Sequence, residues 1–206
     1  MKQTICRTFP AADTYILPVA GPAARTVSIG KELNYAIDLA LEQCFKANLG
    51  EIKVITVPVT GNLIQIVLLG LGELPIIPRK LYLNMARALR VCKEGGAKEV
   101  AVALDNLPAL CEDATLFETA CRLPALVNYA NTGRKTNPNI KAYEEVYFVT
   151  EHAGLQPYMQ AAMDSAQGTV LARMLCNQPA SVQTPYSRGE DAAKLGVELS
   201  LIHISE

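Results

Sequence analysis

Hydrophobic and polar positions alternate with two different periods along the chain. Five stretches are rich in valine, isoleucine, leucine or aromatic residues and are bounded by proline, glycine, asparagine or charge, a pattern typical of β-strands. The expected strands span residues 14–19, 52–59, 63–69, 99–104 and 145–150. Thr60-Gly61-Asn62 separates the second strand from the third. A connection this short predicts an antiparallel hairpin.

Between these strands, apolar residues recur with the i, i+3, i+4, i+7 spacing of amphipathic helices. The expected helices span residues 31–48, 78–94, 113–130 and 155–176. Pro124 falls inside the third of them and is expected to kink or split it. Strands and helices in this alternating order predict an α/β fold, a mixed sheet with helices on both faces.

A boundary is expected after the fourth helix, because turn-forming and capping residues crowd into residues 177–187. Ser187 is a candidate N-cap for a short helix over residues 189–195, with Glu190 at the third helical position as in a capping box. Residues 196–204 alternate in polarity, which predicts a strand with no neighbour to pair with. The chain is therefore expected to stop shortly after a second domain begins.

The composition fits one domain with a sizeable core and some additional chain, because 50% of the 206 residues are hydrophobic and 19% are charged. The formal net charge of −1 provides no positive field for nucleic acid or acidic lipid. The N-terminus lacks the apolar core of a secretory signal, and the longest apolar stretch, residues 63–77, is too interrupted to span a bilayer. These features predict a cytoplasmic protein without nucleic-acid or membrane partners.

Six cysteines are spread along the chain without a C-x-x-C pair: Cys6, Cys44, Cys92, Cys111, Cys121 and Cys176. Cys44 and Cys92 lie on the apolar faces of expected helices, which suits reduced thiols in a core. Neither a disulfide framework nor a zinc site is expected from this spacing.

Few residues are candidates for catalysis or for binding a ligand or metal. The two histidines are His152 and His203, and they form no metal-binding spacing such as H-E-x-x-H. His152 follows the last expected strand, a place where α/β folds bind ligands, although an ordinary loop histidine is the plainer interpretation. Asp105 lies just past another strand and either faces a crevice or serves as a turn or capping residue.

Gly70 and Gly72 form the most suggestive local motif, because a strand runs directly into two glycines. Backbone of this kind can approach a phosphate closely. Pro75 stands where a dinucleotide-binding fingerprint has its third glycine, and no Lys-Ser/Thr follows as in a P-loop. A tight turn between strand and helix is the alternative.

The order of several motifs resembles the N-terminal domain of the leucyl (cytosol) aminopeptidase family. The first part of the likeness is the strand 66–72 (IVLLGLG), followed by residues 85–89 (MARAL) in a helix and the strand 97–102 (AKEVAV). The stretch GTVLARMLCNQPASVQTP, residues 168–185, resembles the connector of the same family. The matching connector residues are Gly168, Ala172, Arg173, Leu175, Asn177, Pro179, Thr184, Pro185 and Ala192.

The likeness extends over about residues 13–199, with two departures. Met174 stands where the family usually has an aspartate. Residues 123–135, which include Pro124, differ from the family's Gly-Ser/Ala-Tyr-x-Phe pattern. Residues 201–206 match nothing expected at that place in the family.

The resemblance implies a two-domain enzyme. Residues 1–153 would be an N-terminal domain with a fold similar to macro domains, residues 154–186 a connector helix and turn, and residues 187–206 the truncated beginning of the catalytic domain. In the family, that catalytic domain holds two divalent metals, Zn or Mn, through a lysine, several aspartates and a glutamate. A metal-bound water attacks the N-terminal peptide bond of a peptide, and members assemble as hexamers.

None of the family's metal-binding motifs occurs in this sequence. The resemblance therefore implies no catalytic, metal-binding or cofactor-binding residue here. The chain is expected to be inactive alone and to position and oligomerise a catalytic domain. Two alternatives stay open, a stand-alone macro-type module that binds a nucleotide or ADP-ribose, and a purely structural or interaction subunit.

Overall fold

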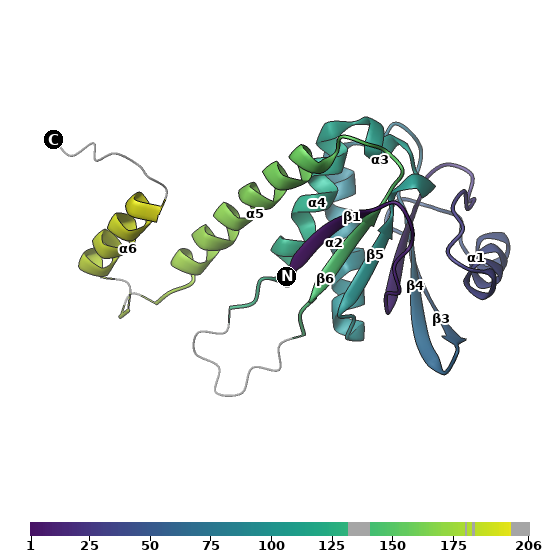
Figure 1. The fold of residues 1–206 in the computed structure, drawn as a ribbon, viewed down its shortest axis with the longest axis horizontal. Helices are drawn as coiled ribbons and strands as arrows, with labels where there is room; N and C mark the ends of the chain where they lie inside the picture. The colour runs from purple at the N-terminus through teal and green to yellow at the C-terminus, as the bar shows by residue number, and fades with distance from the viewer. Residues whose placement is uncertain (132–140, 180, 183, 199–206) are drawn as a thin grey trace.

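The computed structural model describes residues 1–131, 141–179, 181–182 and 184–198 (Figure 1). Its centre is a six-stranded sheet in the order β1-β6-β5-β2-β4-β3. The strands are β1 (Lys2–Cys6), β2 (Thr14–Val19), β3 (Ile52–Val59), β4 (Asn62–Gly70), β5 (Glu99–Ala103) and β6 (Glu145–Val149). All neighbouring pairs are parallel except β3 with β4, which form the expected antiparallel hairpin.

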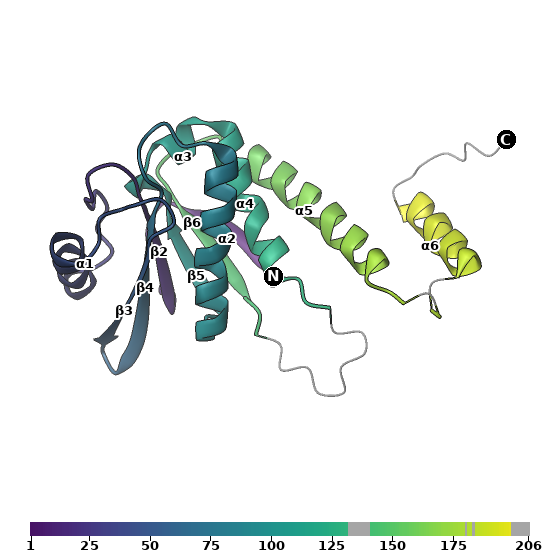
Figure 2. The ribbon, with the colours of Figure 1, turned by 180° about the vertical axis from the view of Figure 1, so that it is seen from behind.

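Helices cover both faces of this sheet, so the predicted mixed α/β sandwich is confirmed. Figures 1 and 2 show α1 on one face and α2, α4 and the start of α5 on the other. The longer helices are α1 (Lys31–Gln43), α2 (Pro78–Gly95), α4 (Ala114–Asn128), α5 (Gln156–Cys176) and α6 (Pro185–Glu198). Two short helical turns, η1 (Leu104–Asn106) and α3 (Ala109–Glu112), follow β5. No helix in the described ranges is long and apolar enough to cross a bilayer.

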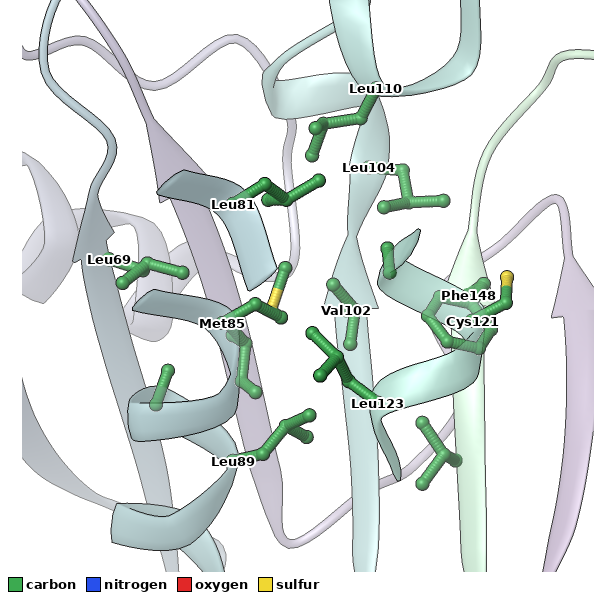
Figure 3. Packing of buried hydrophobic residues seen from close by; sticks show 14 of the residues in the cluster. Leu69, Leu81, Met85, Leu89, Val102, Leu104, Leu110, Cys121, Leu123 and Phe148 are labelled. Atoms are coloured by element: carbon green, nitrogen blue, oxygen red, sulfur yellow. The ribbon is translucent and has the colours of Figure 1, made fainter. Parts of the chain in front are cut away.

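The larger core lies between the sheet and the helices α2 and α4. Figure 3 shows Met85 and Leu89 of α2 facing Val102 of β5 and Leu123 of α4. Phe148 of β6 completes this layer and meets the ring of Phe117 edge-on, with 6.3 Å between centroids. Apolar side chains therefore bind α2 and α4 to the middle of the sheet.

The second core lies under α1, where Leu33, Ile37 and Ala40 face the sheet. The sequence predicted this helix as far as residue 48, but it ends at Gln43. The chain then turns so that Phe45 enters the same core. As a result Cys44 is exposed rather than in the core, whereas Cys92 is buried as expected.

Strand bounds agree with the sequence prediction to within one residue, but β1 was missed. β1 is short, and its one buried side chain is the polar Gln3. Its place is set by parallel pairing with β6, more than a hundred residues away in the chain. α4 also differs from the expectation, because it continues through Pro124 without being split.

The C-terminal prediction is corrected in part. α6 begins at Pro185 and runs to Glu198, so residues 196–198, predicted as strand, are helical. The N-cap is Thr184 rather than Ser187, because the Thr184 Oγ1 accepts the backbone N–H of Ser187 at 3.2 Å. The rest of the predicted strand, together with residues 201–206, lies outside the described residues.

Gly70 marks a close approach between the end of β4 and residues 47–50. A Cβ atom at this position would lie 2.2 Å from the carbonyl oxygen of Asn48 and 2.8 Å from the carbonyl carbon of Ala47. Only glycine lets the two backbone segments meet here without a shift. Gly72, two residues on, has a φ of +72°, which also favours glycine.

We expect Leu89→Ala to lower the free energy of unfolding by about 2–5 kcal/mol, because it empties part of the larger core. Leu83→Ala on the same helix is the matched control, since Leu83 is 54% exposed and Leu89 only 1%. The control should change stability by less than about 0.5 kcal/mol. Urea unfolding followed by circular dichroism measures both, and equal losses would contradict the packing described.

We expect Gly70→Ala to destabilise the fold by about 3 kcal/mol, because the new methyl group meets backbone that cannot rotate away. The control is Gly168→Ala inside α5, where no atom lies within 4 Å of the added Cβ. That change should stabilise the protein by up to about 1 kcal/mol. Thermal unfolding of the two variants tests the contrast, and a neutral Gly70→Ala would refute the close approach.

Candidate functional site at the carboxyl ends of the strands

Loops that follow parallel strands meet at one edge of the sheet, because the carboxyl ends of these strands all point the same way. The loops after β1, β2, β5 and β6 surround an open pocket of about 650 Å³. Its polar lining includes Arg7, Thr8, Ser28, Asp105, Glu151 and His152. Two of the residues singled out in the sequence, Asp105 and His152, therefore lie at the same pocket.

Asp105 is held in place by hydrogen bonds to both carboxylate oxygens. The hydroxyl of Thr150 donates to Oδ1 at 2.6 Å, and the backbone N–H of Glu151 donates to Oδ2 at 2.8 Å. Asp105 belongs to η1 after β5, and its donors follow the neighbouring strand β6. The carboxylate thus joins the ends of two strands, and its remaining lone pairs stay available.

Cys111 of α3 lies behind this carboxylate. Its Sγ is 3.3 Å from the Thr150 hydroxyl oxygen, and Thr150 itself is buried. Because the Thr150 hydrogen goes to Asp105, the thiol must be the donor, giving the order Cys111 S–H, Thr150 O–H, Asp105 carboxylate. Burial raises the pKa of the Cys111 thiol, which keeps it protonated at neutral pH.

His152 completes the group from the exposed side. Its backbone N–H donates to the Thr150 hydroxyl oxygen at 3.1 Å, and its imidazole is exposed at the pocket. Ligand atoms of Asp105, Cys111 and His152 all lie within 4.8 Å of one another. No pattern in the sequence marks Cys111 as part of a site, because the fold alone brings it close to Asp105 and His152. His203 lies outside the described residues.

This group does not fit the paired metals that the family resemblance implies. It offers one carboxylate, one thiol and one imidazole, whereas the resemblance implies a lysine and several carboxylates. Within the described part of the chain, it is the only cluster of three such side chains close enough to share one ion. No step of peptide hydrolysis is therefore derived from it.

Two further interactions shape the loop after β2 that forms one wall of the pocket. The buried Asn106 side chain donates to the carbonyl of Pro18 and accepts the backbone N–H of Thr26. Arg25 forms two hydrogen bonds of 2.8 Å with Asp38 of α1, and these lower the pKa of that carboxyl group. The wall is thereby tied to both β2 and α1.

The Gly70–Gly72 turn does not form a phosphate cradle, although this motif was the main sequence argument for a nucleotide site. The backbone N–H groups of Gly70, Leu71 and Gly72 donate to the carbonyls of Glu51, Val19 and Ala47, at 2.8, 2.8 and 3.0 Å. All three amides are thus already bonded within the protein. The turn is the tight strand-end packing considered as the alternative.

Helix α5 is tied to the C-terminal end of α4. The carbonyls of Val127 and Asn128 accept hydrogen bonds from the Lys93 ammonium of α2, at 2.8 and 3.1 Å. Leu126, one residue earlier, accepts a hydrogen bond from the guanidinium of Arg173 in α5 at 3.1 Å. These carbonyls have no partner inside the helix, so cations from two other helices satisfy them.

Asn177 adds a second bond between the connector and the end of α4. Its side-chain amide donates to the hydroxyl of Tyr129 at 2.9 Å. Arg173 and Asn177 are both among the residues that carry the family resemblance. Thr184 and Pro185, also in that set, cap and begin α6. The matched residues of the connector therefore fix its geometry.

Comparisons with known proteins find relatives in the family that the sequence motifs resemble. No model of a known protein family matches the chain. A probable cytosol aminopeptidase of Clostridium perfringens is 30% identical over 179 residues, which are 81% of this chain and 35% of the relative. One of Synechococcus elongatus is 26% identical over 175 residues, 82% of this chain and 34% of the relative. The chain thus spans about a third of the length of the curated relatives it matches.

Solved structures show the same fold. A tomato leucine aminopeptidase mutant superimposes with a TM-score of 0.77 and 19% identity, covering 97% of this chain and 43% of that protein. The bottromycin maturation enzyme BotP gives a TM-score of 0.69, also at 19% identity, over 93% of this chain and 38% of its own. The sequence matches relate the chain to part of the cytosol aminopeptidases, and the solved structures show that it shares the fold of part of a leucine aminopeptidase.

Proposed function

We propose that this chain serves as the non-catalytic N-terminal part of a leucyl aminopeptidase and positions a catalytic domain that follows it. The observation that carries the proposal is the match to curated aminopeptidases over 81% of this chain but only 35% of the relative. The proposed division is an N-terminal domain of residues 1–153, a connector of residues 154–186 and the start of the next domain from residue 187.

The shape of α5 supports a positioning role. Its buried residues, Met159, Ala162 and Ala166, all lie in its first half and pack toward the body. The second half extends past the sheet, and α6 lies beyond it (Figures 1 and 2). The second half of α5 together with α6 is called the arm here. Apolar side chains are exposed along it, with Met174 at 50% and Tyr186 at 78%. Surfaces of this kind suit packing against a further domain.

The whole protein would remove N-terminal amino acids from peptides in the cytoplasm as a hexamer. Two divalent metals, Zn or Mn, would activate the attacking water in the catalytic domain. A structure of BotP is described as a complex with Mn, which supports metal use among the relatives. The part played by the present residues is to hold the arm at a fixed angle to the sheet through Arg173 and Asn177.

The chain alone is expected to show no turnover of leucine p-nitroanilide with added Mn²⁺ or Zn²⁺. A chimaera in which it replaces the matching N-terminal part of the Clostridium perfringens relative should hydrolyse the same substrate. Release of p-nitroaniline measures both. Robust turnover by the chain alone, or a folded chimaera without activity, would contradict the proposed role.

We expect Arg173→Met to loosen the arm while leaving the body intact, because the Leu126 carbonyl loses its donor. The lost hydrogen bond should lower the free energy of local opening by about 1 kcal/mol. Backbone amides in the second half of α5 should therefore exchange hydrogen for deuterium at least about threefold faster. The control is Met174→Ala, the exposed neighbour, which should leave exchange unchanged. Mass spectrometry of the exchange separates the two, and equal protection in both variants would refute the anchoring.

A further inference from the structure

Asp105, Cys111 and His152 bring three different metal-ligating groups together from three segments of the chain. Their ligand atoms lie within 4.8 Å of one another. Ligand atoms around a tetrahedral zinc ion lie about 3.2–3.8 Å apart, given bonds of about 2.0–2.3 Å. The 4.8 Å limit exceeds this spacing by about 1.0–1.6 Å, and rotation of the exposed His152 side chain can shorten its distances to the other two ligands.

Hydrogen bonds around the group hold the ligands as the outer shell of a metal site does. Thr150 and the Glu151 amide fix both oxygens of Asp105, and each oxygen keeps a lone pair. Thr150 also sets the place of the Cys111 sulfur and of the backbone at His152. Such partners orient ligands and strengthen metal binding by about 10- to 100-fold.

The chemistry of the donor set selects the ion. A thiolate, an imidazole and a carboxylate suit zinc and its analogue cobalt, whereas Mg²⁺ and Ca²⁺ prefer oxygen ligands alone. Three protein ligands leave a fourth tetrahedral position for water or another small ligand. Asp105 and His152 line the open pocket, so that position is reached from solvent.

We propose that Asp105, Cys111 and His152 bind one Zn²⁺ ion. The sequence predicted no zinc site because the three residues share no sequence spacing; β5, α3 and the end of β6 bring them together. On binding, the thiol proton leaves to solvent and the sulfur–zinc bond forms, with no change of oxidation state.

The experiment titrates Co²⁺ into metal-free, reduced protein and records the thiolate-to-cobalt absorption, followed by competition with Zn²⁺. One ion per chain is expected. Cys111→Ser should abolish the absorption and weaken Zn²⁺ binding more than about tenfold. Cys176→Ser, which removes an exposed thiol far from the group, should change neither.

His152→Gln provides a second test that does not depend on a buried position. It should keep the fold and weaken Zn²⁺ binding by at least about tenfold. Absence of the cobalt absorption in the unmodified protein, its survival in Cys111→Ser, or unchanged Zn²⁺ affinity in His152→Gln would each overturn the proposal.

The pH dependence of binding separates thiolate ligation from attachment to surface carboxylates. The titratable groups around the Cys111 thiol are the imidazole of His152, the carboxylates of Asp105 and Glu112 and the thiol of Cys121. Zn²⁺ binds the thiolate rather than the thiol, so binding must displace the Cys111 proton. Affinity should fall about tenfold per unit as pH drops from 8 to 7. Affinity that is independent of pH would overturn thiolate ligation.

Discussion

The C-terminal end of α4 is the point on which the arrangement of the helices depends. Its last carbonyls lie between α2 and α5, where they need partners other than the helix itself. Lys93 and Arg173 provide them, one from each neighbouring helix. Burial lowers the pKa of Lys93, yet its ammonium is placed at the negative end of the α4 dipole, which favours a cation. The same few atoms thus join the core helices to the arm.

The two sides of the carboxyl edge of the sheet differ in what they can bind. At the carboxyl edge, the turn after β4 is closed by its own hydrogen bonds, whereas the loops after β5 and β6 leave side chains at an open pocket. The difference follows from packing, since residues 47–50 press against Gly70 whereas Asp105 stays partly exposed at the pocket. Polar chemistry is therefore available on the β5–β6 side of this edge, and the nucleotide interpretation of the glycine motif loses its basis.

Much of the fold could be predicted from periodicity, because the central strands are continuous apolar runs and the helices keep one apolar face. The prediction was wrong where a distant contact decides the structure. β1 has too few apolar residues to be recognised, and α1 ends early because Phe45 turns into the second core. The sequence indicated two of the three residues of the candidate site, because Asp105 and His152 follow strands. Cys111 could not be predicted, because it joins them only through the turn formed by η1 and α3.

The residues that carry the family resemblance in the connector perform geometric tasks. Arg173 and Asn177 tie α5 to the end of α4, while Thr184 and Pro185 start α6 after the turn. A connector whose function is to set the position of a following domain needs fixed contacts at its base and a defined break at its end. Met174 lies exposed between these contacts, so its side chain takes no part in the bonds on either side. The likeness is therefore concentrated where the direction of the arm is determined.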